Sequence, residues 1–284
     1  MKRLNFILIF SLVICVTSGS HCNKKNPVDN DDQIIPAPDG WKLVWHDEFD
    51  GTAIDLNKWS HEVNAQGGGN NELQYYTDRP ENSYIEDGCL VILALKEHYT
   101  GPEGTRNYTS ARLRTLRKGD WKYGRFDIRA KLPYGKGIWP AIWMLPSEWK
   151  YGGWAASGEI DIMEILGHEP NKVHGTLHYG GQWPNNVYSG KSYSLSQGSF
   201  ADDFHLFTIE WDTTQFRWYV DGIFYQSQNK WHTSSAPYPA PFDQYFHLLL
   251  NVAVGGNWPG DPDNTTVFPQ KMIVDYVRVF QRMK

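Results

Sequence analysis

Short segments in which apolar and polar residues alternate dominate the chain after its first 40 residues, and they constrain its fold more than any other feature. In Tyr123–Leu132, the apolar residues from Phe126 onward alternate with charged residues. A period of two residues is the pattern of a β-strand with one buried face and one solvated face. Further segments with strand character are Leu90–Lys96, Thr109–Leu116, Lys172–Tyr179, Phe204–Trp211, Phe216–Val220, Tyr245–Val254 and Met272–Phe280.

Turn-forming residues separate these segments, and we find no long apolar stripe at helical spacing, so the sequence predicts an all-β protein. Val220–Ile223 has Asp-Gly at its centre, which indicates a tight hairpin. Many strands with short connections predict two packed antiparallel sheets. About 245 residues follow from Gly40 onward, and a sandwich of that size can fold as one domain. We therefore expect a single domain over residues 40–284.

The N-terminus has the organisation of a secretory signal peptide, which we assign to residues 1–22. A basic start, Met1–Arg3, precedes an apolar run, Leu4–Val16, and then small and polar residues. The apolar run is shorter than the ~20 residues of a membrane-spanning helix. Cys22 is followed by a polar, proline-bearing tether over residues 23–39, as at the start of a bacterial lipoprotein. The protein is thus secreted, or anchored to the outer membrane by a lipid on Cys22.

Charge and aromatic content limit the class of partner. The formal net charge is -5, and we find no Lys/Arg run longer than two residues, which argues against nucleic acid. Aromatic residues make up 15% of the chain and include 13 Trp. Such a supply suits a protein that stacks the flat faces of sugar rings. We expect a monomer that acts on a polysaccharide.

The segment Gly158–Gly167, with the sequence GEIDIMEILG, carries the candidate chemistry. In a strand, Glu159 and Asp161 share one face, and strict alternation would place Glu164 on the opposite, apolar face. Burying an unpaired carboxylate there is costly. We therefore predict a β-bulge at Met163, which returns Glu164 to the acidic face and lets the apolar row continue.

Three acids on one face of a strand repel one another and so suggest a function beyond folding. Glycoside hydrolysis needs two carboxyl groups, one protonated and one ionised, and closely spaced carboxylates shift each other's pKa apart. The alternative is a solvated acidic edge. The bulge pattern and the surrounding aromatic residues favour catalysis.

Several long motifs in this chain resemble those of family 16 glycoside hydrolases, and in particular the bacterial laminarinases. The acid segment is similar to the family's E-I-D-I-M-E motif, and the resemblance extends from Trp41 to Arg282. The accompanying motifs are Asn71–Thr77, Tyr123–Phe126, Gly137–Pro146 and His174–His178.

This resemblance implies a β-jelly-roll sandwich with a substrate cleft on its concave sheet and a retaining double displacement. It implies that Glu159 is the nucleophile and Glu164 the general acid and then base, with Asp161 bonded to the nucleophile. The bulge, together with the segment around Glu72, favours an endo-β-1,3-glucanase.

The resemblance also assigns residues around the acids to the binding of sugar. Trp139 and Trp143 lie four residues apart and so share a face, as stacking platforms in a cleft would, although core packing is the alternative. The further candidates that we assign to substrate binding are Glu72, Arg112, Trp154, His178, Asn251 and Trp258.

Asp275 is the candidate for a metal site. By alternation Ile273, Val277 and Val279 share its face of the last strand, where a charge should be paired or bound to a metal. The resemblance implies a structural calcium ion held by Asp275, Glu48 and the carbonyl of Gly88, and a salt bridge is the alternative. Oxygen ligands suit calcium. We expect no cofactor for catalysis.

Two alternative functions stay open. One is a different polysaccharidase of the same family, such as a β-1,3-1,4-glucanase, although those enzymes typically lack a residue at the position of Met163. The other is a glucan-binding protein without catalytic activity, although both Glu159 and Glu164 are present here.

Overall fold

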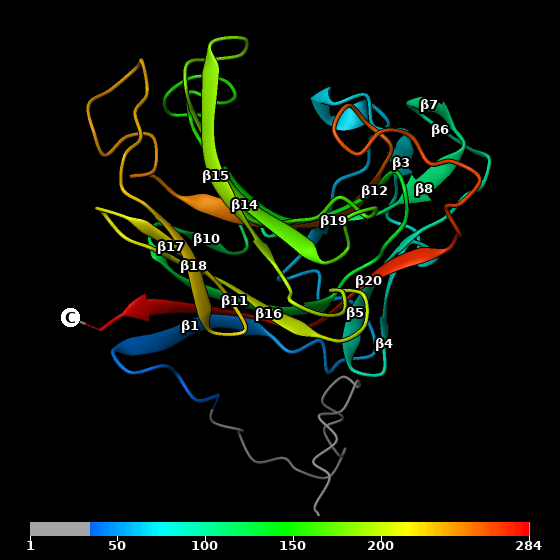
Figure 1. Cartoon of the computed structure of the whole chain (residues 1–284), viewed down its shortest axis with the longest axis horizontal. Helices are drawn as coiled ribbons and strands as arrows, with labels where there is room; N and C mark the ends of the chain where they lie inside the picture. The colour runs from blue at the N-terminus through cyan, green and yellow to red at the C-terminus, as the bar shows by residue number, and fades with distance from the viewer. Residues whose placement is uncertain (1–34, 284) are drawn as a thin grey trace, which may run out of the picture.

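The computed structural model describes residues 35–283, which form β-strands, connecting loops and one short 3-10 turn, η1 (Gly67–Gly69). The predicted signal peptide, Cys22 and most of the predicted tether lie outside these residues. Two large antiparallel sheets pack face to face, as Figure 1 shows, so the predicted all-β sandwich is confirmed. Within the described residues, no helix is long and apolar enough to cross a membrane.

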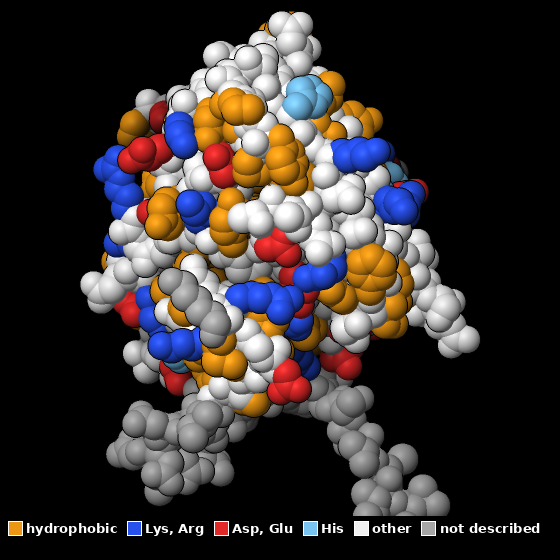
Figure 2. Space-filling view, turned by 90° about the vertical axis from the view of Figure 1, so that its left-hand side faces the viewer, with side chains coloured by type: hydrophobic (Ala, Val, Ile, Leu, Met, Phe, Trp, Pro, Cys, Tyr) orange, Lys and Arg blue, Asp and Glu red, His pale blue; other side chains and the backbone are white. Residues whose placement is uncertain are grey.

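The first sheet forms one of the two layers of the sandwich. Its strands follow the order β18-β17-β16-β11-β20-β5-β4, and β1 pairs with β20 as well. Their bounds are β1 (Trp41–Asp47), β4 (Ser83–Glu86), β5 (Cys89–Ala94), β11 (Gly124–Lys131), β16 (His205–Trp211), β17 (Phe216–Val220), β18 (Ile223–Gln228) and β20 (Gln270–Arg282). On the side of the molecule seen in Figure 2, acidic, basic and apolar side chains are interspersed, and no charge of one sign dominates.

The second sheet carries the candidate site. Its strands follow the order β15-β14-β13-β12-β19-β9-β2, and β10 pairs with β19. Their bounds are β2 (Ser60–His61), β9 (Arg112–Arg114), β10 (Asp120–Trp121), β12 (Ile138–Pro146), β13 (Glu159–Glu164), β14 (Lys172–Gly180), β15 (Asn186–Ser194) and β19 (Phe246–Val254). Two small sheets, β3 (Gln74–Tyr76) with β8 (Tyr108–Ser110) and β6 (Tyr99–Gly101) with β7 (Gly104–Arg106), complete the fold.

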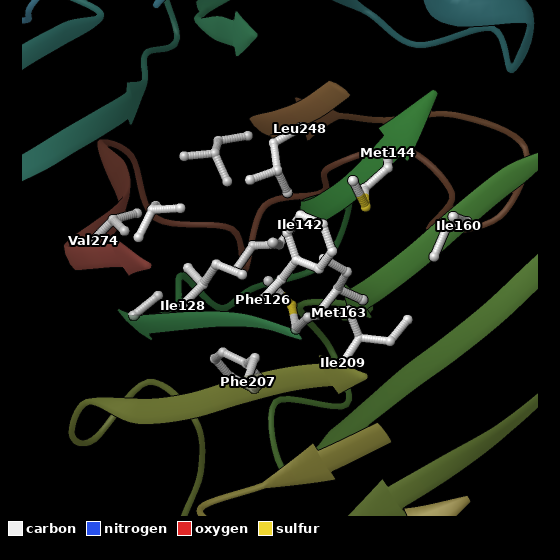
Figure 3. Packing of buried hydrophobic residues seen from close by; sticks show 14 of the residues in the cluster. Phe126, Ile128, Ile142, Met144, Ile160, Met163, Phe207, Ile209, Leu248 and Val274 are labelled. Carbon is white, nitrogen blue, oxygen red and sulfur yellow. The ribbon is translucent and has the colours of Figure 1, made fainter. Parts of the chain in front are cut away.

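The core fills the space between the two large sheets. Phe126 and Ile128 of β11 are fully buried there, as their alternation predicts, and they face Ile142 of β12 and Leu248 of β19 (Figure 3). All seven other predicted strand segments contain strands. The predicted segment Thr109–Leu116 is interrupted at Ala111, where the chain leaves β8 and joins the second sheet as β9.

Candidate active site

A β-bulge in β13 places the three acids on one face of the strand. Asp161 lies opposite Trp143 of β12, whereas Met163 lies opposite Ile142, so the chain has one extra residue between these pairs. The side chains of Ile162 and Met163 are both buried in the core, where Met163 packs near Ile142 and Phe126 (Figure 3). The predicted bulge is therefore confirmed, and the apolar row continues at Ile165.

Glu159, Asp161 and Glu164 line a cleft of about 610 Å³ on the open face of the second sheet. The adjacent strand β12 contributes Trp139 and Trp143, and β19, on the other side of β12, contributes Asn251. The complete lining, apart from the three acids, is Gly68, Gly69, Asn70, Glu72, Arg112, Trp139, Ala141, Trp143, Leu145, Trp149, Trp154, Trp183, Asn251 and Ala253. Five indole rings in one cleft offer broad apolar faces to a flat ligand.

Each glutamate accepts a hydrogen bond from its own tryptophan. Nε1 of Trp154 donates to Oε2 of Glu159 at 2.8 Å, and Nε1 of Trp139 donates to Oε1 of Glu164 at 3.0 Å. These bonds fix the orientation of both carboxyl groups toward the cleft. They also leave the second oxygen of each group available to a ligand, since no other hydrogen bond to it occurs among the described residues.

The electrostatics of the site raise the pKa values of both glutamates. Burial and the nearby carboxylate of Asp161 raise the pKa of Glu159 to about 7. Burial, Asp161 and Glu159 together raise the pKa of Glu164 well above its usual value. Near neutral pH the arrangement therefore favours a protonated Glu164 beside a Glu159 that can ionise.

His178 of β14 lies beside the acids rather than in the cleft lining. Its Nε2 atom is 3.2 Å from Oδ2 of Asp161 and 3.7 Å from Oε1 of Glu159. Burial alone would lower its pKa, but the bond to Asp161 and the charges of the carboxylates raise the pKa to about 9. In the described residues these three side chains also form a group whose donor atoms lie within 4.8 Å of one another, so they could hold a metal ion.

A second polar network surrounds Arg112 on β9. Its guanidinium group lies over the rings of Tyr76 and Trp143 and 3.7 Å from Oε2 of Glu72. Asn251 accepts a hydrogen bond from Nε1 of Trp143 at 2.7 Å and donates one to the hydroxyl of Tyr76 at 3.1 Å. This network holds one wall of the cleft and presents polar groups to a ligand.

Most of the predicted sugar-binding residues meet in this cleft. Glu72, Arg112, Trp139, Trp143, Trp154 and Asn251 all line it. His178 instead contacts the acids from β14. Trp258 lies outside the lining and packs edge-on against Trp139, with ring centroids 5.4 Å apart, and against His174.

Sequence analysis missed part of the cleft lining, namely Trp149, Trp183 and the glycines of η1. Both tryptophans lie in loops, where strand periodicity gives no indication of direction. An exposed tryptophan between glycine and proline, as in Gly181–Pro184, is the signal that could have identified Trp183.

The residues predicted to bind calcium lie in and beside the first sheet, and the carboxylates pair with arginines. Oδ2 of Asp275 lies 2.6 Å from Nη1 of Arg129, and Glu48 accepts two hydrogen bonds from Arg278. Gly88 lies in the turn between β4 and β5. The oxygen-only donor set suits calcium, and both carboxylates are paired with arginines here, so calcium stays a prediction.

The expected neighbours of Asp275 were wrong in part. β20 contains a second bulge, in which Ala130 lies opposite Val274 and Arg129 lies opposite Tyr276, so Asp275 is the extra residue. Val277 and Val279 therefore face the core, whereas Asp275 is directed to Arg129. A one-residue insertion shifts the alternation, which a strict period of two does not anticipate.

Comparison with known proteins agrees with this geometry. The family described as "Glycosyl hydrolases family 16" matches residues 56–278. Glucan endo-1,3-beta-glucosidase A1 of Niallia circulans is 45% identical over 87% of this chain, which spans only 39% of that protein. Beta-glucanase of Rhodothermus marinus is 43% identical over 99% of this chain and 95% of that protein. The laminarinase catalytic domain of Thermotoga maritima is 46% identical, with a TM-score of 0.77 over 86% of this chain and 99% of that domain.

Proposed function

Because this chain belongs to family 16 of the glycosyl hydrolases, we propose that it hydrolyses internal bonds of β-1,3-glucan, with Glu159 and Glu164 as its two catalytic carboxyl groups. The observation that carries this proposal is the bulge at Ile162 and Met163, because it brings both glutamates to one cleft, where burial and neighbouring carboxylates raise the pKa of each. Two carboxyl groups in different protonation states are what glycoside hydrolysis requires.

We propose a retaining double displacement. Ionised Glu159 attacks the anomeric carbon and forms a glycosyl ester while protonated Glu164 gives its proton to the departing oxygen. Glu164, now ionised, takes a proton from water, and the water oxygen breaks the ester and frees Glu159. The hydrogen bonds from Trp154 and Trp139 support these roles, because they hold each carboxyl group in place through both steps.

Asp161 and His178 are positioning residues in this proposal. Asp161 is 2% exposed and lies between the two glutamates along the strand, so its charge opposes ionisation of both. The imidazolium of His178 offsets part of that charge and favours the ionised form of Glu159. The pair therefore sets the pH range in which Glu159 can act as nucleophile.

The lining of the cleft supports a neutral glucan as substrate. Indole faces dominate it, and Arg112, its one cationic side chain, is already neighboured by Glu62 and Glu72. A sulfated polysaccharide would need free cationic groups in the cleft. The relatives from Niallia circulans and Rhodothermus marinus are a glucan endo-1,3-beta-glucosidase and a beta-glucanase, which agrees with a β-glucan substrate.

A comparison of initial rates on laminarin, barley β-glucan and carboxymethylcellulose tests the substrate. We expect the fastest release of reducing sugar from laminarin, with oligosaccharides of several lengths among the first products. A preference for barley β-glucan would instead indicate a β-1,3-1,4-glucanase, and release of glucose alone would contradict internal cleavage. A protein that binds laminarin and releases no sugar would be a glucan-binding protein.

Glu159→Gln and Glu164→Gln test the catalytic assignment. Each change should lower kcat on laminarin by at least about 10²- to 10⁴-fold, the range that acid or base catalysis contributes. A mechanism-based fluorosugar should label wild-type protein at Glu159, as peptide mass spectrometry would show. Activity of either variant within tenfold of wild type would disprove the assignment.

We also propose that the protein acts outside the cytoplasm, as its N-terminal sequence predicts. Mass spectrometry of the mature protein from a bacterial host decides between the two forms. An acylated N-terminal Cys22 indicates an anchored lipoprotein, and an N-terminus beyond Cys22 indicates secretion.

A further inference from the structure

A second hollow adjoins the cleft and shares Trp183 with it. It lies between the β14–β15 turn and the loop that contains His232. Neither the proposed mechanism nor the predicted sugar-binding residues use it. Its lining consists of Gly180, Gly181, Gln182, Trp183, Asn185, His232 and Ser234.

Backbone hydrogen bonds fix the loops around this hollow. The amide of Trp183 donates to the carbonyl of Trp154 at 2.8 Å, and Trp154 in turn donates to Glu159. The amide of Gly180 donates to the carbonyl of His232, and the amide of Ser234 donates to the carbonyl of Gly180, both at 3.0 Å. The hollow is therefore held in a defined position relative to the catalytic strand.

The chemistry of the lining suits a sugar ring. The side chain of Trp183 is 72% exposed and offers an apolar face. The side chains of Gln182, Asn185, His232 and Ser234 supply polar groups that have no hydrogen-bond partner among the described residues. No carboxylate, lysine or arginine lines this hollow, so a neutral ligand with many hydroxyl groups fits it better than an ion.

Two glycines allow the turn beside the hollow to pack closely. A Cβ atom on Gly181 would lie 2.8 Å from the carbonyl oxygen of Asn185, and one on Gly180 would lie 3.2 Å from Cγ2 of Val187. Gly180 also has a φ of 95°, which other residues rarely adopt. Both positions therefore favour glycine, which lets the turn that carries Trp183 close tightly beside the hollow.

We propose that Trp183 and this hollow form a remote subsite that binds a neutral glucosyl unit of the polysaccharide, beyond the units that contact Trp154. This inference rests on the proposed function for the identity of the sugar. A unit bound there adds binding energy at a distance from the reacting bond, which raises the rate for long substrates.

The test compares Trp183→Ala with wild type on β-1,3-gluco-oligosaccharides of increasing length and on laminarin. We expect kcat/KM to fall by about tenfold on laminarin and the longest oligosaccharides, in the range found for tryptophan at binding interfaces, and to fall progressively less as the substrate is shortened. Gln182→Ala should show the same dependence on length with a smaller loss. Tyr134→Ala is the control, because Tyr134 is an exposed aromatic residue that lines neither hollow.

Equal losses on all lengths, or no loss on any, would overturn the subsite. If wild type cuts no β-1,3-glucan, the proposed function is wrong, and affinity electrophoresis then decides the subsite separately. In gels that contain laminarin, barley β-glucan or agarose, the subsite requires that Trp183→Ala migrates faster than wild type with at least one polysaccharide. Equal migration in all three would overturn it.

Discussion

The Nε2 atom of His178 lies 3.2 Å from Oδ2 of Asp161, the side chain between the two proposed catalytic glutamates on β13. The contact crosses from β14 to β13 and brings a cation to a strand that carries three acids. The charge balance of this strand and its bulge therefore both act on the proposed catalytic pair.

Replacing His178 by Gln should shift the pH dependence of activity. Its positive charge lowers the pKa of Glu159, so its loss should raise that pKa above about 7. Since the nucleophile must be ionised, the acid limb of the kcat/KM profile should move to higher pH, by about one unit. His98→Gln is the control, because His98 is exposed, does not line the cleft and is distant from the acids in sequence. A loss of activity without a shift of the acid limb would contradict this role.

Glu159→Gln should stabilise the fold at alkaline pH. The pKa of Glu159 is raised from 4.5 to about 7, so its ionisation costs the native state stability as pH rises through this interval. Glutamine removes that cost and still accepts the bond from Trp154. The thermal midpoint should therefore exceed that of wild type at pH 8 and equal it at pH 4.

Calorimetry at the two pH values checks this prediction, with exposed Glu81→Gln as the matched control. A lower midpoint for Glu159→Gln at both pH values would show that the carboxylate contributes to stability rather than opposing it.

Deleting Met163 tests whether the bulge, rather than the packing of the Met163 side chain, positions Glu164. Without this residue a regular strand still places Glu164 opposite Ala141 and directs it to the cleft, but the local bend and twist of the bulge are lost. We expect activity on laminarin to fall by more than about tenfold, because catalysis is sensitive to displacements near 1 Å.

Met163→Ala is the control for the deletion, since it keeps the bulge and loses only core packing. It should destabilise the protein by about 2–5 kcal/mol and keep most of the activity at a temperature where it is folded. If the two variants have equal activity at that temperature, the bulge does not position Glu164.

Calcium should raise the thermal midpoint if Asp275, Glu48 and the carbonyl of Gly88 bind it, since a ligand of the native state stabilises by mass action. EDTA should lower the midpoint. Arg129→Gln sharpens the test, because it frees Asp275 from its ion pair and should increase the response to calcium. A midpoint that responds to neither calcium nor EDTA would contradict calcium binding at these carboxylates.

The sequence by itself determined the strands and the catalytic face. The alternation of apolar and charged residues in β11 predicted which side chains are buried, because a strand has only two faces and one of them packs against the core. By the same rule Glu164 would lie on the apolar face of its strand. An unpaired carboxylate is not stable among Ile160, Ile162 and Ile165, so the sequence predicted the bulge.

Only the tertiary structure decided which loops complete the cleft and where single side chains find partners. Trp183 reaches the cleft through a backbone bond to Trp154, which is 29 residues earlier in the chain. Trp258 packs against Trp139 in a T-shaped arrangement and does not line the cleft. Asp275 pairs with Arg129 because a bulge shifts its strand. Contacts of this kind depend on the packing of distant segments, and no local period in the sequence records them.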